Sequence, residues 1–312
     1  MKGYTVTGII ILFVLINLSV FTFGQDSILT SEERLEIGNR VISDSRKAIY
    51  GKLEPSKISG YEVAIEGETI RNMITTRTDN KSRSKVTKTK SEEGAGFFLP
   101  DQGFGFHKLS ELGGGTPIVV ATSRKFNGDT FTESVEMFRD GKRIDLASVA
   151  AMLPASVSST TKGEISNLSM KSNIAQLKRY FWELIYPIIL DAPWDPDTKP
   201  VYIYRGKAKV GETECDLVEL NRGSTDKVNL FFDQSTKLLV LLTIESATDT
   251  SRQKTSYYYS DFSLMEGITI AKQIAITSVS TNSAPSRLDE IASQESKTQT
   301  KQKVVKFKMK FK

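Results

Sequence analysis

The 312-residue chain contains a single cysteine, Cys215, and a single histidine, His107. One cysteine cannot form an internal disulfide, so stability must come from packing. Zinc sites need clusters of Cys and His, and neither a nucleophile-elbow nor a cysteine-protease signature accompanies His107. Turn chemistry explains Asp195-Pro-Asp197 better than calcium binding does, and no pattern favours the paired carboxylates of a glycosidase, although distant acids can meet in a fold. The sequence therefore predicts no catalytic residue, no metal site and no cofactor, and we expect the protein not to be an enzyme.

The excess of positive over negative charge is also small. The formal net charge of +5 falls to +4 without Lys2, and no nucleic-acid-binding motif is present, so we expect no nucleic-acid partner. The exception is Lys81–Lys90, which holds five cations and no acid. Such a segment could contact anionic lipid head groups or an acidic partner, but the basic, solvated face of an edge strand is the favoured interpretation.

Residues 1–24 form a leader rather than part of the fold. Lys2 is its only charge, an apolar stretch runs through Ile9–Phe23, and small residues precede a cut before Gln25. This layout is typical of a secretory signal peptide, with an uncleaved N-terminal anchor as the alternative. We therefore expect an exported, periplasmic protein of residues 25–312, with outer-membrane association as a variant of that location.

The first predicted element is an amphipathic helix. Thr30-Ser-Glu-Glu33 has the form of a capping box, apolar residues recur at helical spacing from Leu35 to Ile49, and Gly51 stands at the usual C-terminal position. The helix is expected to lie against a sheet.

An N-terminal meander is predicted over about 60–146. It is expected to hold strands on either side of a Gly67-Glu68 turn and two hairpins, at Asn127-Gly128 and Asp140-Gly141, because these pairs tolerate positive φ angles. Gly94–Pro117 carries no phosphate-loop motif. It is expected to be either a mobile loop rimming a pocket or, as we favour, an irregular connection.

A helical lid segment is predicted over about 147–192. Within it, the stretch from Ser172 to Leu190 is apolar nearly all round at helical spacing, and such helices are normally buried. A stiff proline-containing linker follows, up to Pro200.

The C-terminal meander is predicted over about 201–278, with turns at Val210-Gly211, Asp233–Lys237 and Met265–Gly267. A short helix is expected around Leu288–Ala292. A terminal strand is expected over about 303–312, where apolar and lysine residues alternate. The chain is thus expected to be mainly β, within the α+β class.

If there is a binding site, it should be apolar, since the strands have one apolar face and the predicted apolar helix could cover it. Alternation on three strands and helical spacing in the lid define the apolar cavity candidates: Val228, Leu230, Phe232, Val240, Leu242, Ile244, Ile268, Ile270, Ile274, Ile276, Leu177, Phe181 and Leu184. The same side chains could instead fill the space themselves and leave no room for a ligand.

The order of elements and several short motifs resemble the outer-membrane lipoprotein-sorting (LolA-like) superfamily of bacterial exported proteins. The motifs are Tyr204-Arg-Gly206, Val210-Gly211, Leu230-Phe-Phe-Asp233, Leu238-Leu239 and Tyr259-Ser-Asp-Phe262 with Gly267 five residues on. The resemblance implies an open antiparallel half-barrel of about eleven strands covered by a few helices, with an apolar cavity for lipid or acyl chains. Ala271 stands where relatives often have proline, and the Lys303–Lys312 ending has no counterpart.

We therefore expect a non-enzymatic carrier for a lipid, an acyl chain or a lipoprotein in the bacterial envelope, acting as a monomer. Its partner would be a lipid or an acylated protein, with another envelope protein as a further option. The alternative is a structural or interaction protein of the envelope with a self-filled core and no ligand.

Overall fold

The computed structural model describes residues 29–77, 82–98, 103–112, 118–127, 130–144, 200–221, 226–248, 250–282 and 291–311. The predicted signal peptide and the predicted helical lid lie outside these residues and stay predictions. The described residues form one α-helix, α2 (Ser31–Tyr50), a short 3-10 helix (Pro55–Lys57) and thirteen strands.

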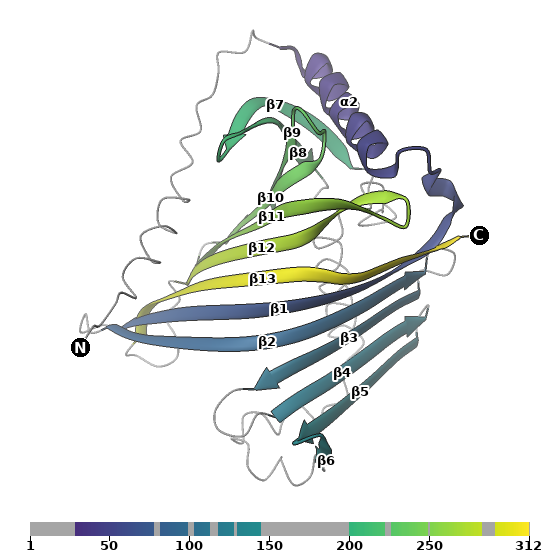
Figure 1. Ribbon diagram of the computed structural model, residues 1–312. Helices are drawn as coiled ribbons and strands as arrows, with labels where there is room; N and C mark the ends of the chain where they lie inside the picture. Colours follow the sequence, from purple (N-terminus) through teal and green to yellow (C-terminus); the bar gives the residue numbers. More distant parts are fainter. Residues whose placement is uncertain are drawn as a thin grey trace, which may run out of the picture.

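All thirteen strands belong to one antiparallel sheet with the order β6-β5-β4-β3-β2-β1-β13-β12-β11-β10-β9-β8-β7 (Figure 1). The predicted open half-barrel is confirmed, with thirteen strands rather than about eleven. β1 and β13 pair at its centre and so join the two meanders. The strands are β1 (Ile58–Arg77), β2 (Ser82–Phe98), β3 (Gly103–Leu112), β4 (Ile118–Asn127), β5 (Thr130–Arg139), β6 (Lys142–Ile144), β7 (Val201–Val210), β8 (Thr213–Asn221), β9 (Lys227–Asp233), β10 (Leu239–Ala247), β11 (Ser251–Met265), β12 (Ile268–Asn282) and β13 (Ile291–Phe311).

Two predictions for the N-terminal meander are wrong. Gly67-Glu68 is not a turn, because β1 runs through it and Gly67 pairs with Gln302 on one side and Ser91 on the other. Most of Gly94–Pro117 is not an irregular connection either, because β2 and β3 form a hairpin in which Gly94 lies opposite His107. Glycine weakens a strand but keeps both backbone hydrogen-bonding groups, so neighbouring strands can hold it extended.

The predicted turns at Asp140-Gly141 and Met265–Gly267 are confirmed. Asp140 and Gly141 have φ angles of 51° and 72°, and Glu266 and Gly267 have φ angles of 51° and 87°. Positive φ at both central residues is the signature of the two-residue turns that suit the twist of paired strands. The prediction of a turn centred on Asn127-Gly128 is wrong by one residue, because Asn127 is the last residue of β4 and pairs with Thr130, whereas that turn would pair Phe126 with residue 129.

The terminal strand is longer than predicted. β13 begins at Ile291, so the short helix expected around Leu288–Ala292 is wrong for its last two residues, and the others lie outside the described part. Its lysine-rich C-terminal part lies at the centre of the sheet and pairs with β1. Lys301, Lys303 and Lys308 lie directly opposite Glu68, Glu66 and Glu62. Opposite charges in facing cross-strand positions stabilise the pairing.

The helix α2 lies in the opening of the curled C-terminal half of the sheet (Figure 1). It contacts β7 and β12, which stand five positions apart in the strand order, so the sheet must curve round it. The predicted capping box is present, with Glu33 N–H donating to Thr30 Oγ1 at 3.2 Å and Thr30 N–H donating to Glu33 Oε2 at 2.7 Å. Gly51 ends the helix by donating its N–H to the Lys47 carbonyl at 2.9 Å.

Candidate functional site

The predicted cavity residues meet on one face of the C-terminal half-sheet, here called the inner face. Their strands place them together, since residues directly opposite in antiparallel strands share a face: Leu242 faces Leu230, and Ile244 faces Val228. Ile276 packs against the edge of the cluster. The buried candidates are Val228, Leu230, Phe232, Leu242, Ile244, Ile268, Ile270 and Ile274, each at most 3% exposed.

Val240 is the exception. The register between β9 and β10 shifts between Leu239 and Leu241, so that Leu239 faces Phe232 while Leu241 faces Phe231. This β-bulge inserts one extra residue and turns the following side chains over. Val240 therefore packs on the opposite face, against a smaller cluster of Ala208, Cys215, Leu217, Phe231 and Leu241. Strict alternation could not have revealed the bulge.

The inner-face candidates are covered by α2. Ile42, Ile49 and Tyr50 of the helix are at most 3% exposed and belong to the same core cluster. Sequence reasoning placed a different helix here, through Leu177, Phe181 and Leu184, and these three residues lie outside the described part. The helical spacing of Ile42 and Ile49 was the signal that could have assigned α2 to this position.

Gly38 lets the helix come down onto the sheet. A Cβ atom at this position would lie 2.3 Å from the backbone oxygen of Tyr202 in β7. Only glycine permits such an approach of two backbones. Ser45 of α2 is 0% exposed, and its hydroxyl has no hydrogen-bond partner among the described residues.

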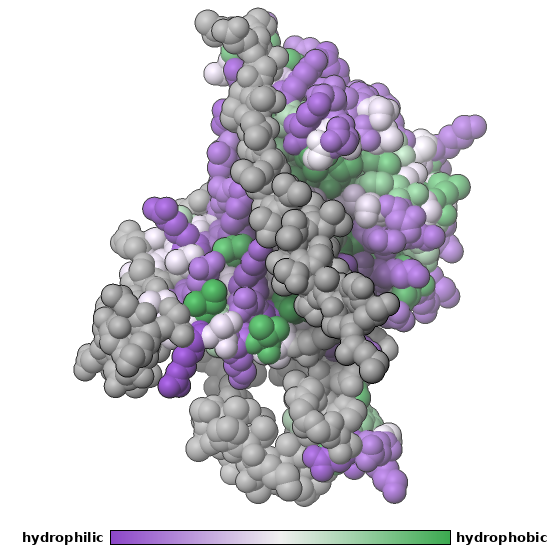
Figure 2. Space-filling model, turned by 60° about the vertical axis from the view of Figure 1, so that its left-hand side comes forward, coloured by the Kyte–Doolittle hydropathy of each residue, from purple (hydrophilic) through white to green (hydrophobic). Residues whose placement is uncertain are grey.

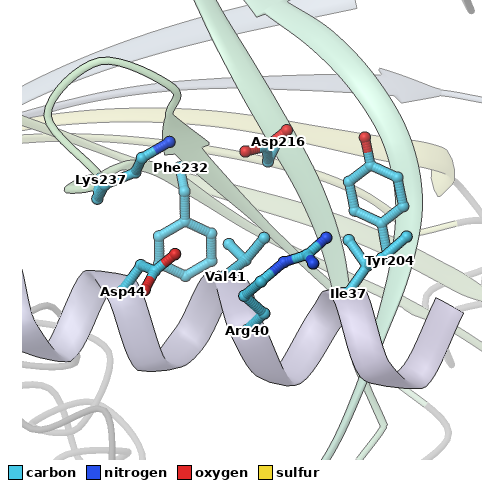
Figure 3. A pocket seen from close by; sticks show the side chains of 8 residues that line it. All are labelled: Ile37, Arg40, Val41, Asp44, Tyr204, Asp216, Phe232 and Lys237. Carbon is cyan, nitrogen blue, oxygen red and sulfur yellow. The ribbon is translucent and has the colours of Figure 1, made fainter. Parts of the chain in front are cut away.

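A pocket of about 300 Å³ opens beside α2, between the helix and strands β7–β9 (Figure 3). Its volume is at the lower end of small-molecule sites. The walls carry two cations and two carboxylates, so it has no net charge. Asp216 accepts a hydrogen bond from Gln234 Nε2 at 2.8 Å, and Asp44 pairs with Lys47 at 3.2 Å. The lining residues are Ile37, Arg40, Val41, Asp44, Tyr204, Asp216, Phe232 and Lys237.

The hairpin that carries Lys237 is held by Asp233. Its carboxylate accepts hydrogen bonds from Ser235 N–H at 2.7 Å and Thr236 N–H at 3.3 Å. Burial by itself raises the pKa of Asp233, but the hydrogen bonds from Ser235 and Thr236 outweigh it and hold that pKa below its ordinary value. Lys237 has a φ angle of 63° and donates its N–H to the Asp233 carbonyl at 2.8 Å.

The inner face becomes polar beyond α2. Along β1, Ile65 is buried in the core, whereas Thr69, on the same face four residues later, is half-buried and shares a hydrogen bond of 2.9 Å with Thr300. Further along, Thr255 and Ser278 share one of 3.1 Å. We call this region the hydroxyl-amide face; by strand register it holds Thr69, Thr75, Gln253, Thr255, Ser278, Ser280, Gln294, Ser296, Thr298, Thr300 and Gln302.

The outer face differs in kind. It carries the lysines and glutamates of β13 and β1 together with separate apolar side chains such as Ile70 and Val279, which are 40% and 37% exposed. In the left part of Figure 2, separate hydrophobic side chains lie among hydrophilic ones, whereas a larger hydrophobic area lies toward the upper right. Single exposed apolar residues of this kind are normal on protein surfaces.

The cysteine of the sheet is shielded from reaction. Cys215 is a free thiol that is fully buried, and burial, together with the nearby Asp233 and Asp216 carboxylates, raises its pKa to about 12. The described residues contain no group of three His, Cys, Asp or Glu side chains able to hold a metal ion. Among them, no helix is both long enough and apolar enough to cross a membrane.

No family model matches the chain, and no curated protein does. Solved structures that it resembles include MucB, at 9% identity over 86% of this chain and 93% of that one with a TM-score of 0.21. The MucA/MucB complex of Pseudomonas aeruginosa gives 6% identity over 88% and 100%, with a TM-score of 0.18. A mutant of the monoaromatic hydrocarbon channel TodX gives 8% identity over 79% and 90%, with a TM-score of 0.24. TM-scores this low support no transfer of function, so any functional conclusion must come from the chain's own residues.

Proposed function

We propose that this is an exported, non-enzymatic binding protein of the bacterial envelope whose ligand is a lipid, an acyl chain or an acylated protein. One observation carries the proposal: a single face of the half-barrel passes without interruption from an apolar core under α2 to the hydroxyl-amide face. An amphipathic ligand has the same two halves. The predicted signal peptide and the resemblance to LolA-like proteins support the same conclusion.

The ligand's apolar part would approach the candidate residues from the hydroxyl-amide face. Ile276, which is half-buried and opposite Thr300, stands at the boundary and would be met first. The deeper candidates, such as Leu230 and Leu242, are 0% exposed. They would become accessible only when α2 moves away from the sheet.

The burial of these candidate residues favours a second function, that of a structural or interaction protein. If α2 does not move, the apolar half of the inner face is a self-filled core, as expected for a structural or interaction protein of the envelope. The contact between Gly38 and β7 supports this alternative, because it ties the helix closely to the strand.

The two proposals are separated by lipid binding. Native mass spectrometry of the protein purified from the periplasmic fraction should detect co-purified lipid. A fluorescent fatty-acid probe should bind the delipidated protein and be displaced by unlabelled fatty acid. A protein that carries no lipid and does not bind the probe would contradict the carrier proposal and leave the structural one.

A further inference from the structure

Three cations lie on the inner face, near the end of β1 and the start of β2. Arg71 of β1 lies opposite Thr87 of β2, and the next pairs along the same face are Met73 with Lys85 and Thr75 with Arg83. The register between β1 and β2 is unbroken from Gly60 to Thr76, so these positions share the face of the buried Ile65. All three cationic side chains, Arg71, Arg83 and Lys85, are exposed.

The three positive charges follow one another along the same face of β1 and β2, with Lys85 between Arg71 and Arg83. Neighbouring and diagonal positions on one face of a sheet are about 7 Å apart, and like charges at such positions repel. None of the three has an ion-pair partner among the described side chains. The hydroxyl-amide face next to them contains no carboxylate. An anion bound there would remove the repulsion.

Protection of an edge strand does not account for the whole cluster. Among the described strands, residues 82–90 of β2 pair only with β1, because β3 lies opposite Ser91–Phe98, and basic side chains commonly protect such an unpaired edge. Arg71 is different, since β1 pairs with β2 on one side and with β13 on the other. A central strand has no edge to protect, so Arg71 needs another explanation.

The distance from the cluster to the apolar core matches a lipid. Six residues separate Ile65 from Arg71, which corresponds to about 20 Å along an extended strand at about 3.3 Å per residue. One leaflet with its head groups is about 20 Å thick, half of a bilayer of about 40–45 Å. A phosphate at Arg71 would therefore place the polar head-group and ester region on the hydroxyl-amide face and the ends of the acyl chains at the apolar core.

We propose that Arg71, Arg83 and Lys85 bind the head group of an anionic phospholipid whose acyl chains run along the inner face toward α2. This proposal rests on the proposed function and specifies its ligand. The cations supply selectivity for a phospholipid with net negative charge over a zwitterionic one, and this attraction is weakened by salt.

The test compares fluorescently labelled phosphatidylglycerol with the equivalent phosphatidylcholine, each delivered from vesicles to the full-length protein. We expect wild-type protein to bind phosphatidylglycerol about tenfold more tightly at low salt, with the preference shrinking as salt rises. R71Q/K85Q should lose that preference and bind both lipids alike. K297Q/K303Q is the matched control: it removes two exposed charges from the outer face of β13 and should keep the preference.

Each outcome has a distinct meaning. Equal binding of both lipids by the wild-type protein would overturn the head-group proposal while leaving the carrier function intact. The same loss in R71Q/K85Q and in K297Q/K303Q would also overturn it, because net charge rather than the cluster would then be responsible. If neither lipid binds, the carrier function itself is contradicted. Circular dichroism should show the native fold in both variants, since all four residues are exposed.

Discussion

Gly38→Ala sets two effects of known sign against each other. In an exposed helix, this change stabilises by about 1 kcal/mol, because alanine is the better helix former. Here the new Cβ would lie 2.3 Å from the Tyr202 backbone oxygen, and contacts below 3.0 Å are essentially never seen, so α2 must move by at least the 0.7 Å between these values. A backbone oxygen inside a strand cannot turn aside as a side chain can.

The movement weakens the contacts of the buried face of α2. A gap of about 0.5–1 Å forfeits roughly a quarter to a half of the van der Waals attraction, and overpacking typically costs about 1–3 kcal/mol. Ile42 and Ile49, both 1% exposed, would lose part of their packing. After subtraction of the helix-forming gain, we expect Gly38→Ala to lower the free energy of unfolding by about 1–2 kcal/mol.

Urea denaturation would measure this loss as a lower midpoint, with the dependence of the unfolding free energy on urea concentration (the m-value) unchanged. Asn39→Ala is the matched control, because Asn39 is the exposed neighbour on the same helix and gains helix propensity without a clash. It should be slightly stabilising. A Gly38→Ala protein as stable as the Asn39→Ala protein would refute the close approach of α2 to β7. The carrier proposal adds that a loosened α2 should speed uptake of the fatty-acid probe.

Ser45→Ala should raise the free energy of unfolding by about 1 kcal/mol, because it removes a buried hydroxyl that has no partner among the described residues; a loss of stability on thermal melting would indicate a partner, such as a bound water or polar ligand, there. Leu242→Asp should destabilise by more than about 4 kcal/mol and abolish the folded near-UV signal, whereas Gln273→Asp, on an exposed position of β12, should remain folded. Cys215→Ser should fold and lose about 1–2 kcal/mol, through a lost apolar contact. In the wild type, folding raises the pKa of the Cys215 thiol from 9.0 to about 12, so the neutral thiol favours the folded state. This contribution to the free energy of unfolding is fully present below pH 9 and is lost as the pH rises toward 12. Measurement of the free energy of unfolding at increasing alkaline pH should show this fall, and the serine variant should lack it.

Short-range patterns predicted much of the architecture. The capping box at Thr30, the C-terminal glycine of α2 and the turns at Asp140-Gly141 and Glu266-Gly267 depend on neighbours within a few residues. Such features are therefore visible in the sequence. Alternation likewise placed most cavity candidates on one face, because side chains on a strand point alternately to its two sides.

Predictions that depended on distant partners fared less well. The bulge that turns Val240 to the other face exists because the pairing register of β9 and β10 shifts by one residue between Leu239 and Leu241. Gly67 and Gly94 lie in strands because β13, β2 and β3 supply their hydrogen bonds. In a local pattern glycine predicts a turn. Hydrogen bonds from a neighbouring strand on each side can nevertheless hold glycine in an extended conformation.

Local sequence patterns are enough to predict a mainly β protein with a capped amphipathic helix and an apolar stripe on its C-terminal strands. What covers that stripe, and which residues continue it, follows from contacts between distant segments. α2 occupies the opening of the half-barrel because Gly38 meets β7 from 164 residues away along the chain. Arg71 joins Lys85 and Arg83 only through the register of β1 and β2. Both are contacts between residues far apart in sequence, and the periodicity of a single segment holds no information about its partner.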